Sequence, residues 1–340
     1  NNEGTFRMNF IDTTTTVIGP FQVTGYSWTL LLGAVLGVLA VLLLGRKRPG
    51  VSALLTACII TIPCAWAGAR IVYVLTQLET IFVDAEYYGV PFLVQPWQGG
   101  YTLYGAVPGG LLGAWLSAKA VKMPVGEVAD ALAPGAALVL CFTRLGEYFT
   151  QQGLGHMVEN EALQCFPFAV YNEGWDAWQI PVFFYEALAA LAIFIVTACM
   201  ARKCHRAGRS ADLFLGILSV TQVLLESLRD DECIRFGFVR FTQIMAAVTL
   251  FVLLVVNVVR HVRESGDKRG VAARFVIYVL CVGACIAVEF GLDKSTIDNR
   301  LLYVVMTAAL VLLGVVVMSA MSHDLKAEKK PRPRIKRVSI

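Results

Sequence analysis

Nine apolar stretches, each about 20 residues long, are the feature that most constrains what this sequence can fold into. A helix that crosses the hydrocarbon core of a bilayer needs about 20 apolar residues, because each residue adds about 1.5 Å to its length. The stretches cover residues 25–45, 51–78, 102–118, 128–149, 181–201, 212–228, 238–259, 271–290 and 301–321. Charged residues make up only 16% of the chain, against about 25% in soluble proteins. We therefore predict an all-α polytopic membrane protein, and the soluble classes are excluded.

Lys and Arg are unevenly distributed between the two sets of connections that alternate along the chain. Twenty of them fall in the connections at 46–48, 119–122, 202–209 and 260–269 and in the tail from Lys326, against five in the other set. Cytoplasmic connections are enriched in Lys and Arg. We therefore predict that the N-terminus lies outside and the C-terminus in the cytoplasm, which requires an odd number of spans.

Several ionisable side chains interrupt the apolar stretches. Charge is costly inside a bilayer, so such residues mark candidate sites. In the predicted orientation they share one depth in the outer half of the membrane, as a single cavity open to the outside requires. The residues at this depth are Arg70, Tyr73, Arg144, Glu147, Tyr185, Glu186, Glu226 and Arg229, with Tyr26 and Tyr104 near the outer ends of their spans.

Two of these patterns allow more than one interpretation. Arg144 and Glu147, like Glu226 and Arg229, are three residues apart and can form local ion pairs on one helix face. Alternatively, the two pairs form one network that holds an anion, because an arginine fork matches phosphate. The small residues of TLYGAVPGGLLG, Gly105 among them, either allow close helix packing or let the backbone approach a lipid headgroup.

Other functional classes lack support in the sequence. Cysteine and histidine spacings of the zinc kind and nucleotide-binding loops are absent, so we expect no metal, no cofactor and no nucleic-acid partner. A transporter is disfavoured because the sequence shows no internal repeat. Two long outer loops, 79–101 and 150–180, are rich in aromatic residues that either form an interfacial belt or cover a site. A disulfide between Cys165 and Cys233 is left open.

Six short motifs follow one another between Ile18 and about Gln243. They read IGPFQVTGYS, AGARIVYVL, WQGGYTLYGA, RLGEYFTQQGLG, PVFFYEA and LFLGILSVTQVLLESLR. Their order and spacing resemble those of the prolipoprotein diacylglyceryl transferases of bacteria. The resemblance implies seven spans with the N-terminus outside and a site open to the outer leaflet, so that the eighth and ninth spans are additions.

The resemblance also implies a reaction in the bacterial plasma membrane. A diacylglyceryl group would pass from phosphatidylglycerol, or another anionic phospholipid, to the lipobox cysteine thiol of a preprolipoprotein, with release of glycerol phosphate. This chemistry needs a positive clamp for the phosphate and a base for the thiol. The predicted catalytic residues are Tyr26, Tyr104, Arg144, Glu147 and Glu226. The predicted phospholipid-binding residues are Arg70, Gly105, Gln152, Tyr185, Glu186, Gln222 and Arg229.

Four of these positions depart from the family pattern. Tyr104 stands where the family has His, Glu147 where it has Asn, Gln152 where it has Glu, and Gln222 where it has Arg. Tyr26, Arg144, Glu226 and Arg229 match the pattern. One cation and the imidazole are therefore missing, and Glu147 or Tyr104 would have to serve as the base.

Two functions are compatible with these residues. The first is a divergent transferase that uses phosphatidylglycerol in a lipoprotein reaction or a related lipid transfer. The second is a catalytically silent protein that binds a phospholipid, or a membrane partner through residues 271–321. In both cases we predict a transferase-like core at 1–260, two additional transmembrane helices at 271–321, and a basic cytoplasmic tail at 322–340 that lies against anionic headgroups.

Overall fold

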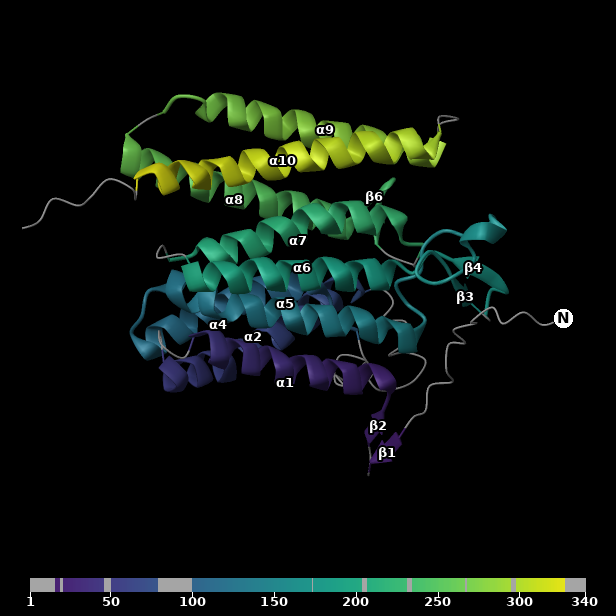
Figure 1. The fold of residues 1–340 in the computed structure, drawn as a ribbon, viewed down its shortest axis with the longest axis horizontal. Helices are drawn as coiled ribbons and strands as arrows, with labels where there is room; N and C mark the ends of the chain where they lie inside the picture. Colours follow the sequence, from purple (N-terminus) through teal and green to yellow (C-terminus); the bar gives the residue numbers. More distant parts are fainter. Residues whose placement is uncertain are drawn as a thin grey trace, which may run out of the picture. The chain divides into compact units, whose positions relative to one another are not determined.

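The structure, a computed structural model, describes residues 16–18, 21–45, 50–78, 100–172, 174–203, 207–230, 234–266, 268–294 and 298–327. Nine long helices form within these residues (Figure 1), and each overlaps one of the predicted stretches. They are α1 (Gly25–Gly45), α2 (Val51–Thr76), α4 (Leu103–Val121), α5 (Val125–Thr150), α6 (Val182–Lys203), α7 (Arg209–Leu228), α8 (Phe241–Ser265), α9 (Val271–Lys294) and α10 (Asn299–Ala327). Eight of them are long and apolar enough to cross a membrane, and α4, which contains Pro108, is the exception. The all-α polytopic fold is confirmed, whereas its orientation across the membrane stays a prediction.

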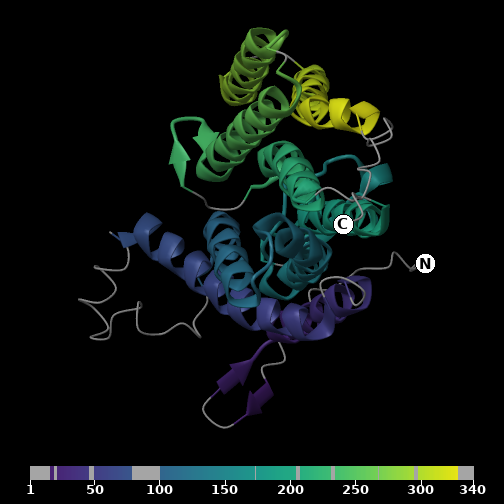
Figure 2. The ribbon, with the colours of Figure 1, turned by 90° about the vertical axis from the view of Figure 1, so that its left-hand side faces the viewer.

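Three short antiparallel hairpins accompany the helices in the part of the chain that the structure describes. β1 (Thr16–Ile18) pairs with β2 (Phe21–Val23) and leads into α1 (Figure 2). β3 (Val170–Asn172) pairs with β4 (Ala177–Gln179) in the connection between α5 and α6. β5 (Arg235–Phe236) pairs with β6 (Val239–Arg240) directly before α8. The last hairpin matters for the site, because it carries a charged residue back toward the end of α7.

The chain divides into two compact units, Asn1–Met245 and Ala246–Ile340. In the first unit α2 packs on α4, α1 on α5, α5 on α6 and α6 on α7. Figure 1 shows α1, α5, α6 and α7 with nearly parallel axes. In the second unit α9 packs on α10. All site residues predicted from the sequence belong to the first unit, while loop residues 79–99, Cys233 and tail residues 328–340 lie outside the described residues.

Glycines bring α2 and α4 into backbone contact. A Cβ atom on Gly105 would lie 2.3 Å from the carbonyl oxygen of Gly68, and one on Gly109 would lie 2.4 Å from that of Cys64. Real side chains do not approach backbone this closely, so only glycine allows the two helices to meet at this distance. The TLYGAVPGGLLG segment therefore packs α4 against α2, which is the first of the two interpretations given above.

The N-terminus of α7 is held by a carboxylate from another helix. Asp130 on α5 accepts hydrogen bonds from the backbone N–H groups of Gly208 at 2.7 Å and Ala211 at 3.0 Å. The first N–H groups of a helix have no partner within it, so a carboxylate there satisfies them and interacts favourably with the helix dipole. This contact fixes α7 to α5 at the end of α7 remote from its C-terminal charges.

Candidate functional site: a buried arginine and glutamate cluster

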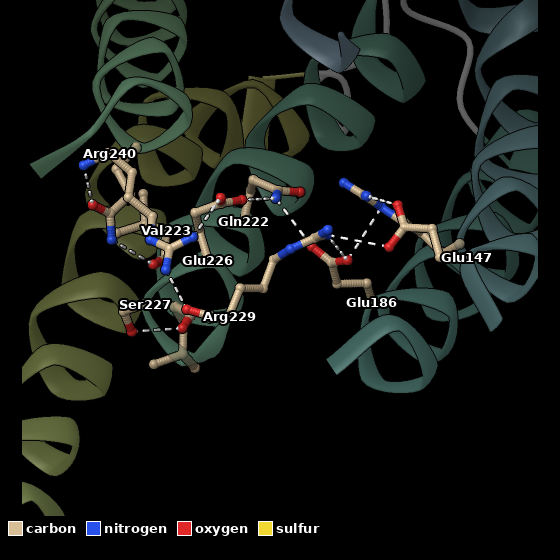
Figure 3. Close-up of polar contacts among 11 residues, drawn as sticks. Glu147, Glu186, Gln222, Val223, Glu226, Ser227, Arg229 and Arg240 are labelled. Carbon is tan, nitrogen blue, oxygen red and sulfur yellow. Dashed lines mark hydrogen bonds and ion pairs between the residues drawn. The ribbon is translucent and has the colours of Figure 1, made fainter. Parts of the chain in front are cut away.

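The charged side chains predicted to share one depth gather at one end of three neighbouring helices. The last two turns of α5 and α7 meet the first two turns of α6, because these packed helices alternate in direction. Figure 3 shows the resulting cluster. Its members are Arg144 and Glu147 from α5, Glu186 from α6, and Gln222, Glu226 and Arg229 from α7 and its C-terminal cap. Three separate sequence motifs thus contribute to one site.

Glu147 lies between two arginines. One of its oxygens accepts a hydrogen bond from Arg144 Nη1, and the other lies 3.3 Å from Arg229 Nη1. Arg144 belongs to the same helix, whereas Arg229 comes from the end of α7. The Arg144–Glu147 pair is therefore a local ion pair that also belongs to a larger network.

Glu186 is the centre of this network. Its Oε2 lies 2.8 Å from Arg229 Nη1 and 3.3 Å from Arg144 Nε. Its Oε1 accepts a hydrogen bond of 3.1 Å from Gln222 Nε2, and the same amide nitrogen donates to Glu226 Oε2 at 2.8 Å. The Glu186 side chain is only 3% exposed. It therefore joins both arginines to each other and, through Gln222, to Glu226.

Arg240 completes the cluster and is not among the residues predicted from the sequence. It ends β6, and its Nη1 lies 3.5 Å from Glu226 Oε1 while its Nη2 donates to the backbone oxygen of Arg229. Its side chain is 7% exposed. From the sequence, Arg240 belongs to an outer connection between two spans. The local sequence does not show that the β5–β6 hairpin folds back on α7 and buries this residue.

The described cluster is balanced in formal charge. Its three arginines, Arg144, Arg229 and Arg240, face the three carboxylates of Glu147, Glu186 and Glu226. Buried ions are tolerated when each is paired and hydrogen-bonded, and removal of one partner leaves an uncompensated charge.

Tyr26 approaches this cluster from α1. A Cβ atom on Gly146 would lie 2.9 Å from Tyr26 Cδ2, so the absence of a side chain at Gly146 lets the tyrosine ring pack against α5. Gly146 lies between Arg144 and Glu147 in the sequence of α5. Gly153, with a φ angle of +72°, makes room on the other side, because a Cβ atom there would lie 2.4 Å from Glu147 Oε2. The structure thus places Tyr26 beside the two charged residues of α5.

Tyr104 projects from the start of α4, and its side chain is buried. Its hydroxyl oxygen has no hydrogen-bond partner among the described residues. A buried hydroxyl without a partner is costly, so this group calls for a functional explanation.

Arg70 occupies a separate environment on α2. Its Nη1 donates to the backbone oxygen of Gly100 at 3.0 Å, and its guanidinium lies 5.8 Å from the ring centroid of Tyr73 and 5.6 Å from that of Tyr101. Such distances allow cation–π attraction. These contacts tie Arg70 to the segment before α4, and none of them joins it to the arginine and glutamate cluster in the described part of the chain.

Two further predicted residues lie beside the cluster without entering these ion pairs. Gln152 is exposed, and its backbone N–H donates to the carbonyl oxygen of Glu147 at 3.2 Å. The Tyr185 hydroxyl donates to the carbonyl oxygen of Pro167 at 2.8 Å. Tyr185 thereby attaches the connection between α5 and α6 to the start of α6. Gly105 packs on α2, as described above.

A small cavity of about 10 Å³, large enough for about one water molecule, adjoins the cluster between α5, α6 and α7. Arg144, Glu186 and Gln222 line it at the charged end, and leucine, isoleucine and alanine side chains form most of the rest. In the part of the chain that the structure describes, no group of three or more His, Cys, Asp or Glu side chains could hold a metal ion. The cluster therefore combines buried charges with an apolar lining on one side.

The fold and this site together define a polytopic membrane protein with a buried, charge-balanced cluster at one end of its helices. The family model described as prolipoprotein diacylglyceryl transferase matches residues 13–262. The chain therefore belongs to the prolipoprotein diacylglyceryl transferase family, as the resemblance predicted. The match includes α1 through most of α8, whereas α9 and α10 lie beyond it.

Relatives in several bacteria bear the same name, phosphatidylglycerol–prolipoprotein diacylglyceryl transferase. The protein of Streptomyces avermitilis is 26% identical over 74% of this chain and 73% of its own length. That of Frankia alni is 31% identical over 63% of this chain and 57% of its own length. That of Symbiobacterium thermophilum is 27% identical over 77% of this chain and 98% of its own length. With its membrane-spanning helices, the chain is a multi-pass protein of the bacterial plasma membrane.

Proposed function

We propose that this protein transfers the diacylglyceryl group of phosphatidylglycerol to the cysteine thiol of a prolipoprotein. The observation that carries the proposal is the convergence of Arg144 and Arg229 on the carboxylates of Glu147 and Glu186 inside a membrane protein. The relatives are named for this reaction. A catalytically silent binding protein is not favoured, because these relatives carry the name of an enzyme.

The two arginines bind the phosphate of phosphatidylglycerol in this proposal. The thiolate of the prolipoprotein attacks the terminal glyceryl carbon of the diacylglyceryl group, and a carbon–sulfur bond forms. The carbon–oxygen bond to the phosphate breaks, and its electron pair leaves with glycerol phosphate. Arg144 and Arg229 stabilise the negative charge that develops on this leaving group.

Glu147 accepts the proton of the thiol. Both of its oxygens are engaged by Arg144 and Arg229 in the structure. Phosphate that binds these arginines displaces the carboxylate, which is then free to act as a base, so lipid binding precedes thiol activation. The Tyr104 hydroxyl, which has no partner among the described residues, donates a hydrogen bond to the phospholipid. Tyr26 packs against α5 beside Arg144 and Glu147, and Glu226 holds Gln222 and Arg240.

The remaining predictions complete this proposal. Glu186 and Gln222 are in direct contact inside the cluster and line the phospholipid site. Arg70, Gly105, Gln152 and Tyr185 support the backbone around it. The site faces the outer leaflet, which follows from the predicted orientation. Residues 1–260 form the transferase core and 322–340 a cytoplasmic tail. Helices within 271–321 add a surface for a membrane partner, since they lie beyond the family match.

Complementation tests the function directly. The chain is expressed in a bacterium depleted of its own diacylglyceryl transferase, beside Arg144→Ala and Tyr104→His variants and an Arg235→Ala control, in which an exposed arginine is removed. We expect rescue by the wild type and by Arg235→Ala, and loss of rescue in Arg144→Ala. Failure of a well-expressed wild type and of Tyr104→His would contradict the proposed reaction.

A further inference from the structure

We propose that Arg240 supplies the buried positive charge that the family places at the position of Gln222, and that it acts as a positioning residue for Glu226 and Arg229. The inference rests on the proposed function and assigns a role to a residue outside the six family motifs.

The contacts of Arg240 join two parts of the site. Its Nη1 reaches Glu226 Oε1 at 3.5 Å, and its Nη2 donates to the backbone oxygen of Arg229 (Figure 3). The backbone N–H of Arg240 donates to Gln243 Oε1 at 3.0 Å, and Gln243 Nε2 donates to the carbonyl oxygen of Val223 at 3.3 Å. The guanidinium is therefore anchored to the last turns of α7, which carry Glu226 and precede Arg229.

The contacts of Glu226 explain how Arg240 can replace an arginine at position 222. Its Oε2 accepts a hydrogen bond of 2.8 Å from Gln222 Nε2, and its Oε1 faces Arg240. An arginine at position 222 would reach the same carboxylate from its other oxygen. Gln222 also lines the small cavity beside the cluster. The positive charge lost at position 222 is thus present on the opposite side of Glu226.

The charge balance explains what Arg240 contributes. Without it, the three negative charges of Glu147, Glu186 and Glu226 would be balanced only by the two positive charges of Arg144 and Arg229. The excess negative charge is buried and repels an incoming phosphate. Arg240 could instead have a purely structural role, as a cap of α7, because arginine at the C-terminus of a helix binds carbonyl oxygens that have no partner within the helix. Moving the charge to position 222 separates the two roles, since that position cannot cap α7 in the same way.

The experiment compares four purified proteins in detergent micelles that contain phosphatidylglycerol. They are the wild type, Arg240→Gln, the double variant Gln222→Arg/Arg240→Gln, and Arg235→Gln, which removes the exposed arginine paired with Arg240 in the β5–β6 hairpin. Two quantities are measured, the affinity for phosphatidylglycerol and the rate of diacylglyceryl transfer to a lipobox peptide. Arg240→Gln should lower both by about tenfold, because hydrogen bonds to charged groups are the strong ones.

The double variant decides the outcome. The proposal is supported if the double variant recovers most of the affinity and rate while Arg235→Gln equals the wild type. This holds also if Arg240→Gln alone fails to fold. Unchanged affinity and rate in Arg240→Gln would overturn it, as would a folded double variant that stays as weak as Arg240→Gln, or a double variant that does not fold. A wild type without transfer refutes the proposed function separately, and the affinities then still test the role of Arg240.

Discussion

The arginine and glutamate cluster and the interface between α2 and α4 solve the same problem in opposite ways. Both hold helices together inside the first unit, where burial of apolar surface provides no net drive because lipid is itself apolar. In the cluster, α5, α6 and α7 are joined by hydrogen-bonded charges such as Glu186 with Arg229. Between α2 and α4, Gly105 and Gly109 remove side chains until backbones touch.

The difference between the two regions indicates which of them can contain an active site. A glycine interface is closed, and the space it leaves is already filled by the neighbouring backbone. A charged cluster can exchange one anion for another without separating its helices, because each arginine keeps a partner. We therefore expect changes in the cluster to affect activity first, and changes in the α2–α4 interface to affect stability first.

The largest expected effect comes from Arg144→Ala. The rate of diacylglyceryl transfer should fall about 10²- to 10³-fold, because removal of one donor to a developing oxyanion costs this much in other enzymes. Initial rates with labelled phosphatidylglycerol and a lipobox peptide measure the loss. Arg235→Ala is the control for loss of a nearby positive charge. A folded Arg144→Ala variant with the wild-type rate would show that the cluster is only structural.

Glu147→Asn should lower the rate about a hundredfold although it restores the residue of the family, since loss of a general base costs at least this much. At the same time the affinity for phosphatidylglycerol should rise, because Arg144 and Arg229 lose a competing carboxylate. Lipid binding and transfer rates are measured on the same preparation. The double variant Tyr104→His/Glu147→Asn, which carries the family pair, should recover activity. A Glu147→Asn variant that is faster than the wild type would assign the base elsewhere.

The α2–α4 interface provides the opposite test. Gly109→Ala should destabilise the protein by about 1–3 kcal/mol, because the added methyl group meets the carbonyl oxygen of Cys64 and overpacks a rigid contact. Gly110→Ala is the matched control, since its nearest neighbour, the Cβ atom of Ala65, is 3.9 Å away. Thermal denaturation in detergent compares the two variants. Equal stability would contradict close packing as the role of these glycines.

The sequence is sufficient to predict the helices and part of the site. Apolar runs as long as a bilayer is thick predict a helix strongly, and residues at one depth in adjacent spans must meet if the helices pack. Arg144, Glu147, Glu186, Glu226 and Arg229 are predicted at one level on this ground, and the structure brings them together. Even the stretch that Pro108 interrupts forms a helix, α4.

The sequence does not predict the rotation of each helix about its axis or the places where the chain folds back on itself. Depth does not determine which way a side chain points, so Tyr185 is predicted with the cluster although its hydroxyl binds Pro167. Gln152 lies within the motif RLGEYFTQQGLG but is exposed. Arg240 enters through a hairpin whose strands are only two residues long, too short to leave a pattern. These placements follow from tertiary contacts that no local spacing encodes.

The smallest expected effect is that of Tyr104→Phe, and it tests the boundary between the two regions. Tyr104 lies on α4, one residue before Gly105 of the glycine interface, yet the proposed reaction uses its hydroxyl to bind the phospholipid. Because this hydroxyl has no partner among the described residues, its removal should leave the thermal stability unchanged or raise it slightly. The transfer rate should nevertheless fall about threefold to tenfold, which corresponds to one hydrogen bond to the substrate. Loss of stability without loss of rate would assign Tyr104 to the packing of α4, and the charged cluster would then act on the lipid without help from this helix.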